Sequence, residues 1–242
     1  MANYWVGTSG YNYREWKGSF YPADIADKEM LAHYAGRFAT VEINYTFYRM
    51  PTVRILANWA RETPDRFRFA LKAPRRITHE QRLRSIEDTL AHFCEVAETL
   101  GPKLGPLLFQ LPPFLRKDVE LLEVFLHDLP TGMRSAVEFR HASWHAEDTY
   151  AVLKRFGVAL CIADSEERTT PFEATAPFGY FRLRRAAYDD AALGAWIERM
   201  EGTTWKDVFV YFKHEERGTG PRYAARFVEL LGGEASTQGS TP

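Results

Sequence analysis

Short apolar runs recur along the chain, and most of them end in a charged or amide side chain. Val41-Glu42-Ile43-Asn44 and Val137-Glu138-Phe139-Arg140 show the pattern, with apolar and polar positions alternating. Since successive side chains of a strand point to opposite faces, the apolar members can pack under helices while the polar members converge beyond the strand ends. The pattern predicts eight strands, at residues 4–8, 41–44, 69–72, 107–110, 137–140, 160–164, 180–184 and 210–214.

Segments with helical periodicity lie between these strands. Strand and helix alternate throughout, and eight strands in a chain of this length favour a TIM-type (β/α)8 barrel, an α/β fold, over an open sheet. Residues 165–171 are too short and too broken for a full helix, so we expect one irregular or missing helix between strands six and seven. Three apolar stripes are clear: Met30, Leu31, Tyr34, Ala35 and Phe38; Leu90, Phe93, Cys94 and Ala97; Leu121, Leu122, Phe125, Leu126 and Leu129.

Composition is that of an ordinary globular protein with one substantial core. The chain has 242 residues, of which 45% are hydrophobic and 26% charged. It contains no internal repeat and no interdomain linker, so we expect a single barrel domain over residues 1–231. Residues 232–242 are small and polar, and we expect them to form a flexible C-terminal tail.

Charge, hydrophobic run length and cysteine content limit the kinds of partner and the compartment that we expect for this protein. A formal net charge of -1 argues against a bulk electrostatic grip on nucleic acid or anionic lipid, so a nucleic-acid partner is not favoured. No apolar run approaches the length of a membrane helix, and no secretory signal precedes the first strand, so we expect a cytoplasmic protein without a membrane partner. Cys94 and Cys161 lack metal-site spacing and are expected to be buried thiols. The oligomeric state stays open.

The polar positions of the strands form the candidate site. Acidic and basic members nearly balance, with an excess of cations, so an anionic ligand group such as a phosphate or carboxylate would complete the neutralisation. The alternative is that these side chains pair with one another as a buried polar plug that closes the barrel. The set that shares the inward face is Glu42, Asn44, Lys72, Gln110, Glu138, Arg140, Arg182 and Arg184, with Asp164 and Lys213 near their strand ends.

The segment Glu138-Phe139-Arg140-His141 has the highest concentration of side chains that could take part in catalysis. Glu138 and Arg140 point the same way two residues apart, and His141 begins the following loop. A carboxylate near Arg140 stays ionised and suits a general base or an acceptor for a ligand hydroxyl, while His141 or His79 can donate a proton. For either histidine, a loop or capping role is the alternative.

Two further readings of the acidic residues stay open. Glu42 and Glu138 invite comparison with the paired carboxylates of glycoside hydrolases, although they belong to well-separated strands of the barrel. A divalent metal is also conceivable but not favoured, because no pair of ligands has diagnostic spacing, and the cofactor is left unknown. The side chains that could supply a metal site are Glu42, His79, Glu138, His141, Asp164 and His214.

Small polar and aromatic residues follow the strand ends. The run Gly7-Thr8-Ser9-Gly10 can expose backbone N–H groups to an anion, although a simple tight turn is the alternative. Aromatic rings at strand ends can stack on a sugar or a base, or can simply wall a pocket. The remaining candidates for substrate binding are Thr8, Ser9, Tyr11, Tyr48, Trp144 and His214.

Several ordered motifs carry a family resemblance: Gly7-Thr8-Ser9-Gly10-Tyr11, Phe20-Tyr21-Pro22, Glu42-Ile43-Asn44, Thr46-Phe47-Tyr48, Ile77-Thr78-His79, Gly105-Pro106-Leu107-Leu108-Phe109-Gln110-Leu111-Pro112-Pro113 and Glu138-Phe139-Arg140-His141-Ala142-Ser143-Trp144. From about Trp5 to Leu231 the chain resembles the YecE-like proteins, domain of unknown function 72. The resemblance implies a TIM-type barrel and no established reaction. Two places differ from the family pattern, which has His-Gly after strand seven and paired Asn at strand eight. Arg184-Arg185 and Lys213-His214 stand there instead and make this pocket more basic.

Two functional hypotheses follow from these residues. The first is an enzyme that performs acid-base chemistry, such as hydrolysis, lysis or isomerisation, on a small anionic compound carrying a ring or sugar. The second is a non-catalytic protein that binds an anionic metabolite or a nucleic-acid segment through Arg140, Arg182 and Arg184. The two differ over Glu138, which only the enzyme would need for turnover.

Overall fold

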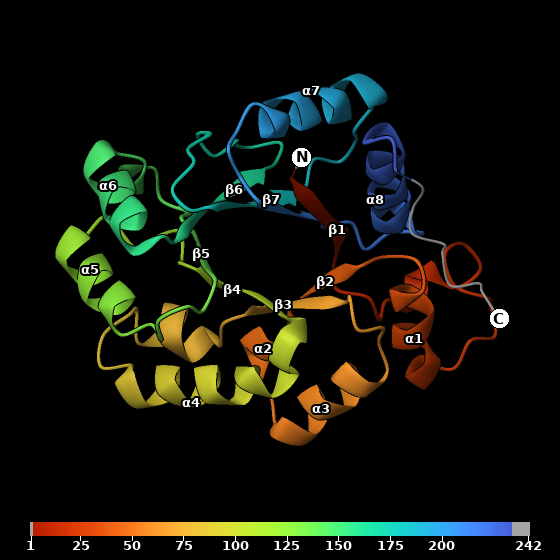
Figure 1. The fold of residues 1–242 in the computed structure, drawn as a ribbon, viewed down its shortest axis with the longest axis horizontal. Helices are drawn as coiled ribbons and strands as arrows, with labels where there is room; N and C mark the ends of the chain where they lie inside the picture. Colours follow the sequence, from red (N-terminus) through yellow and green to blue (C-terminus); the bar gives the residue numbers. More distant parts are fainter. Residues whose placement is uncertain (1, 234–242) are drawn as a thin grey trace.

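Eight parallel strands close into a barrel in a computed structural model that describes residues 2–233 (Figure 1). Each strand pairs with the next in sequence, and the last pairs with the first. The predicted TIM-type barrel is therefore confirmed, while the predicted tail lies, from residue 234 on, outside the described residues. The strands are β1 (Asn3–Ser9), β2 (Thr40–Ile43), β3 (Arg68–Lys72), β4 (Leu104–Gln110), β5 (Ser135–Glu138), β6 (Ala159–Asp164), β7 (Phe178–Leu183) and β8 (Asp207–Phe212).

Helices form an outer ring around the strands (Figure 1). All three predicted apolar stripes face the core, mostly in α1, α4 and α5. Phe38 lies beyond the end of α1 but is buried, and Leu129 lies beyond the end of α5 and is only partly buried. No helix lies in residues 165–177 between β6 and β7, as predicted. The α-helices are α1 (Met30–Ala35), α2 (Tyr45–Tyr48), α3 (Val53–Arg61), α4 (Glu87–Ala97), α5 (Val119–His127), α6 (Glu147–Phe156), α7 (Asp190–Glu201) and α8 (Thr219–Leu230).

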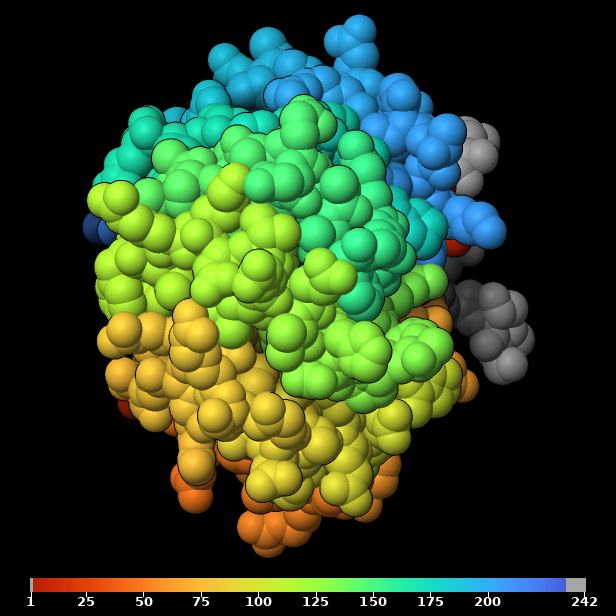
Figure 2. Space-filling model, turned by 90° about the vertical axis from the view of Figure 1, so that its left-hand side faces the viewer, coloured from red at the N-terminus to blue at the C-terminus, as the bar shows by residue number. Residues whose placement is uncertain are grey.

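The helical shell covers the outer face of the strands. Figure 2 shows this from one side, where the green segments around α5 and α6 lie over the barrel. None of the helices in residues 2–233 is long and apolar enough to span a bilayer. Cys94 and Cys161 are both buried and unpaired, as predicted.

The interior of the barrel has two layers. Small and aromatic side chains fill the lower layer, where the Tyr180 and Tyr211 ring centroids lie 5.3 Å apart. Two residues further along most of the strands, on the same face, the side chains become polar, whereas β6 has Ala163 at this level. Ala136 is followed in this way by Glu138, and Tyr180 by Arg182. The polar side chains therefore lie on an apolar floor at the carboxyl end of the strands.

Strand register places the polar side chains beside one another. Ser9 of β1 pairs with Glu42 of β2, and Gln110 of β4 pairs with Glu138 of β5. β1 can approach β2 this closely because position 7 is glycine, where a Cβ atom would lie 2.0 Å from the carbonyl oxygen of Thr40. The register between strands thus brings the inward polar side chains close enough to form hydrogen bonds with one another.

Candidate functional site

Arg182 lies at the centre of the polar side chains and bridges two carboxylates. Its Nη2 and Nε atoms lie 2.9 and 3.2 Å from Oε1 of Glu42, and its Nη1 atom lies 2.5 Å from Oε2 of Glu138. All three side chains are at most 1% exposed. Glu42 and Glu138, predicted to lie on well-separated strands, are therefore joined through one guanidinium group.

The hydrogen bonds continue on both sides of Arg182. On the Glu138 side, Gln110 Nε2 donates to Glu138 Oε2 at 2.8 Å, and Lys72 Nζ donates to Gln110 Oε1 at 2.8 Å. On the Glu42 side, the Ser9 hydroxyl donates to Oε1 and the Tyr180 hydroxyl donates to Oε2 at 2.7 Å. The ring of Tyr180 lies in the apolar layer, and only its hydroxyl reaches up to Glu42. We call this connected set the polar layer: Ser9, Glu42, Lys72, Gln110, Glu138, Tyr180 and Arg182.

The carboxylate of Glu138 is held ionised by its cationic neighbours. Burial alone would raise the pKa of Glu138, but Arg182, Arg184 and the hydrogen bond from Gln110 hold that pKa at about 2. Burial also opposes the charge of Arg182, yet Glu42 and Glu138 raise its pKa well above the usual value. Glu138 is consequently a stable anion and a weak base.

Lys72 differs from Arg182, the other cation of the polar layer, in the direction in which its pKa is shifted. Burial lowers its pKa to about 8, and the positive charge of Arg182 acts in the same direction. Its Nζ atom lies 3.9 Å from the centroid of the Phe47 ring, which packs edge-on against the imidazole of His79. Burial and the charge of Lys72 lower the pKa of His79, so this ring is neutral at pH 7.

Above the polar layer lies a half-buried rim with further cationic side chains. Arg184 Nη2 lies 3.9 Å from Oε1 of Glu138. Burial lowers the pKa of Lys213, and Arg182 and Arg184 add to the effect, which shows that these charges lie near one another. We call the following side chains the cationic rim: Arg140, Arg184 and Lys213.

Two buried polar atoms at this place have no hydrogen-bond partner within residues 2–233. They are Oε1 of Glu138 and Nε of Arg184. Both residues line a cavity of about 20 Å³, room for one water or a single ligand group, together with Arg140, Glu167 and Arg168. A buried polar atom without a partner is costly, so this geometry suits a ligand or water that donates to Glu138 and accepts from Arg184.

An aromatic pocket of about 310 Å³ borders the site at the ends of β1 and β2. The Nδ2 atom of Asn44 ties this pocket to the polar layer by donating to Ser9 Oγ at 2.8 Å. Tyr48, in contrast, is 75% exposed and does not line the pocket. The walls include Tyr11, Tyr13, Asn44, Tyr45, Ile55 and Trp59.

Asp164 lies outside this site, which corrects the expectation that it joins the inward set. Cys161 and Ala163 occupy the inner face of β6, so Asp164 points outward with Ile162. One of its oxygens accepts from Thr169 and Arg185, and the other from Tyr188 and Trp196. Through these hydrogen bonds Asp164 connects the loops that follow β6 and β7.

Thr8 and Trp144 are also engaged in packing rather than exposed to the site. The amide of Thr8 donates to the Tyr34 hydroxyl at 2.8 Å, and its own hydroxyl donates to Gly10 O at 2.6 Å. The glycine-rich turn therefore does not offer these groups to an anion. Trp144 is fully buried, stacks on Phe139 at 4.7 Å, and donates from Nε1 to Leu115 O.

Two candidate histidines have local structural partners. His141 Nδ1 accepts from the amide of Ser143 at 3.1 Å and caps a short 3-10 helix, which matches the capping alternative. His214 lies among aromatic rings, 5.0 Å from that of Tyr223, and its Nε2 atom donates to the carbonyl of Arg185. Neither imidazole belongs to the polar layer.

Sequence reasoning missed Tyr180, Tyr13 and Trp59. Tyr180 lies two residues before Arg182, so strand alternation already places it on the inner face. Tyr13 donates to the carbonyl of Ser9 at 2.8 Å, and Trp59 comes from α3, distant in sequence. Only the folded chain brings Trp59 to this pocket.

The potential metal ligands are dispersed. Within the described part of the chain, no three histidine, cysteine or acidic side chains are grouped so that they could hold a metal ion. Asp164 and His214 both contact Tyr188, outside the polar layer. Glu42 and Glu138 are both bound by Arg182.

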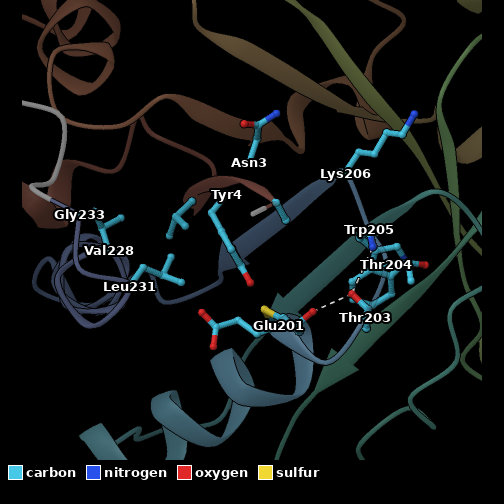
Figure 3. Close-up of a pocket in the computed structure, with 13 residues that line it drawn as sticks. Asn3, Tyr4, Glu201, Thr203, Thr204, Trp205, Lys206, Val228, Leu231 and Gly233 are labelled. Atoms are coloured by element: carbon cyan, nitrogen blue, oxygen red, sulfur yellow. Dashed lines mark hydrogen bonds between the residues drawn. The ribbon is translucent and has the colours of Figure 1, made fainter.

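A larger hollow of about 850 Å³ lies at the other end of the barrel (Figure 3). Its walls come from the start of β1, the end of α7 and the segment before β8, including Tyr4, Glu201 and Lys206. It contains no member of the polar layer, so its size does not identify the candidate site.

Comparisons with known proteins agree with this architecture. The model of the family described as "Protein of unknown function DUF72" matches residues 5–242. The UPF0759 protein YecE of Escherichia coli K12 is 35% identical over 118 residues, a match that covers 48% of this chain and 43% of that protein. The UPF0759 protein YunF of Bacillus subtilis is 25% identical over 234 residues, covering 88% of this chain and 79% of that protein.

A crystal structure of a DUF72 family protein from Thermotoga maritima superimposes with a TM-score of 0.84. It is 27% identical in sequence, and the match covers 95% of this chain and 99% of that one. The chain therefore belongs to the DUF72 family of uncharacterised TIM-barrel proteins.

Proposed function

We propose that this protein is an enzyme that performs acid-base chemistry, such as hydrolysis, lysis or isomerisation, on a small anionic compound containing a ring or sugar. The reaction would take place at the carboxyl end of the barrel strands, in the cytoplasm. Buried free thiols such as Cys94 and Cys161 suit a reducing compartment.

The unpartnered pair of Glu138 Oε1 and Arg184 Nε is the observation that carries the proposal. Both atoms are buried at the boundary between the polar layer and the cationic rim. A ligand with a hydroxyl group next to an anionic group would satisfy both, because the hydroxyl donates to the carboxylate and the anion accepts from the guanidinium.

The cations at this place outnumber the acids. Lys72, Arg182 and the three members of the cationic rim face the inward acids Glu42 and Glu138, with Glu215 near Lys213 and Glu167 at the cavity. A phosphate or carboxylate group would relieve this excess, and Arg184 offers it a planar pair of donors. The aromatic pocket beside Asn44 would then hold the ring of the same ligand.

Each polar group then has a chemical role. Glu138, with a pKa of about 2, accepts and orients a ligand hydroxyl rather than removing a proton itself. Proton transfer belongs to groups whose pKa lies closer to neutrality, namely His79 and Lys72. This assignment also disfavours a glycosidase mechanism, which needs one carboxyl group with a raised pKa.

A non-catalytic binding protein is the second candidate. The observation that favours it is the Glu42–Arg182–Glu138 bridge, in which both carboxylates are already paired. In this case the polar layer would be a static support, and the cationic rim alone would hold an anionic metabolite.

Thermal shift measurements test the anion site. Sugar phosphates, nucleotides, carboxylates and inorganic phosphate are added to the purified protein, and a ligand of the folded state raises its melting temperature. We expect Arg184→Gln to abolish the shift. The matched control is Arg185→Gln, since the neighbouring Arg185 bonds to Asp164 on the outer side. Loss of the shift in both variants, or in neither, contradicts the anion site.

The enzyme and the binding protein are then separated at Glu138. A ligand found by thermal shift is incubated with the protein, and its conversion is followed by mass spectrometry and NMR. Glu138→Gln should abolish turnover and weaken binding by about tenfold, the usual effect of one charge-assisted hydrogen bond. If the bound ligand is never converted by the unmodified protein, the binding protein is the correct assignment.

A further inference from the structure

Lys72 has an unusual set of neighbours for a buried lysine. Its side chain is 8% exposed, and Nζ makes a single hydrogen bond, to the neutral amide oxygen of Gln110. Within residues 2–233 no carboxylate forms an ion pair with this nitrogen. A buried ammonium group normally has an acidic partner, since its charge is costly to remove from water.

The orientation of Gln110 suits an amine at this place. Gln110 Nε2 is committed to the ionised carboxylate of Glu138, so Oε1 must face Lys72 and needs only one donor. A neutral amine supplies that one N–H and keeps its lone pair. Burial is the main cause that disfavours an ammonium ion at Lys72. The charges of Arg182 and Lys213 act in the same direction, and those of Glu138 and Glu42 oppose them in part.

A lysine desolvated beside other cations is the usual form of a nucleophilic amine in enzymes. We propose that Lys72 forms an imine with the carbonyl carbon of a small anionic aldehyde or ketone. This inference rests on the proposed function, because the cationic rim would hold the anionic group of the same compound. The substrate class is then an anionic aldehyde or ketone, and Lys72 is a catalytic residue.

The step is balanced without an oxidant or reductant. The lone pair of Nζ attacks the carbonyl carbon, and a C–N bond forms as the C=O π bond breaks. The nitrogen then gives up one proton and the oxygen takes one, which yields a neutral carbinolamine. Loss of this hydroxyl with one more proton, as water, leaves a protonated C=N bond. His79 contacts the same Phe47 ring as Nζ, and as a neutral imidazole it would pass these protons through water. Water reverses the reaction and releases the amine.

The amine is reached past Phe47. This half-buried ring belongs to α2, a helix of four residues. Tyr48, which follows Phe47 and ends the helix, is 75% exposed. Thr46 anchors the same helix to the chain at Lys72, donating its hydroxyl to the Lys72 carbonyl at 2.6 Å. Rotation of the Phe47 side chain therefore opens an approach to Nζ without moving the strand.

Reductive trapping tests the proposal on the unmodified full chain. The protein is incubated separately with glyoxylate, pyruvate and glyceraldehyde 3-phosphate in the presence of sodium cyanoborohydride, which converts an imine into a stable secondary amine. Peptide mass spectrometry then measures the labelling rate at every lysine. Exposed Lys28 and Lys206 are internal controls, so the comparison does not depend on a variant that folds.

We expect at least one probe to label Lys72 about tenfold faster than either control, as an activated lysine should. Inorganic phosphate should slow labelling at Lys72 but not at Lys28. Labelling at Lys72 should level off above pH 8, whereas labelling of the exposed lysines keeps rising. Lys72→Met should remove the fast adduct in protein whose circular dichroism is unchanged.

Two results would overturn the imine. One is labelling of Lys72 no faster than Lys28 with all three probes, and the other is fast labelling at Lys213 instead. If phosphate still stabilises the protein through Arg184 in either case, the anion site stands and only the role of Lys72 is wrong. If that stabilisation is also absent, the proposed function fails with it.

Discussion

The Nη1 atom of Arg182 lies 2.5 Å from Oε2 of Glu138, where neither side chain is more than 1% exposed. Arg182 comes from β7 and Glu138 from β5, and the same guanidinium group reaches Glu42 on β2. One side chain thus joins three strands through the middle of the barrel. Because Arg182 and Glu138 are buried, each of these two groups depends on its charged neighbours for its ionised state.

Removing Arg182 should destabilise the protein strongly. Arg182→Met leaves two buried carboxylates without their cation, and we expect the free energy of unfolding to fall by about 3–5 kcal/mol. Denaturant titration followed by circular dichroism measures the change. The triple variant Arg182→Met, Glu42→Gln, Glu138→Gln should recover most of the loss. A loss below about 1 kcal/mol in the single variant would contradict the buried bridge.

Acid should weaken the fold through Glu138. The pKa of Glu138 is about 2 in the folded protein and 4.5 in the reference state, so the unfolded chain binds the proton first. This carboxylate therefore stabilises the fold above pH 4.5, by about 3 kcal/mol, and the contribution disappears as the pH falls toward 2. Denaturation curves at several pH values should show a shallower acid dependence for Glu138→Gln. Equal slopes for both proteins would be the contrary result.

Lys72 should have the opposite effect on stability. Its pKa falls from 10.5 in the reference state to about 8 in the folded protein, so folding expels a proton between these values and stability rises with pH through this window. Below pH 8 the buried charge costs about 3 kcal/mol. Lys72→Met should therefore raise the melting temperature at pH 7 and have less effect at pH 10. A lower melting temperature at pH 7 would show that the ammonium is stabilised by its neighbours.

Asp164 should matter for stability and not for the ligand. Asp164→Asn removes the charge that Arg185 binds and disturbs the bonds from Thr169, Tyr188 and Trp196. We expect a loss of about 2–4 kcal/mol in the free energy of unfolding. Thermal shifts by an anionic ligand should keep their size in this variant. An unchanged stability combined with the loss of the thermal shift by the ligand would show that Asp164 belongs to the ligand site.

Strand alternation was enough to predict which side chains enter the barrel. Glu42, Lys72, Gln110, Glu138 and Arg182 were all expected on the inner face, and all belong to the polar layer. This succeeds because the period of two is a property of the extended backbone and needs no knowledge of the neighbouring strands. Asp164 was expected with the inward set at the end of its strand. As the last residue of β6 it follows the inward Ala163 and therefore lies on the outer face.

The pairing of these side chains depended on the closed barrel. Nothing local connects Arg182 to Glu42, which lies 140 positions away on a strand that is not a neighbour of β7. Trp59 likewise reaches the aromatic pocket only because α3 packs against the barrel. The amino-acid order therefore settled the fold class and the inward residues, through periodicities that act over a few positions. Closure of the barrel settled which charges meet, how deeply they are buried and which polar atoms remain without a partner, because those quantities depend on distances across the interior.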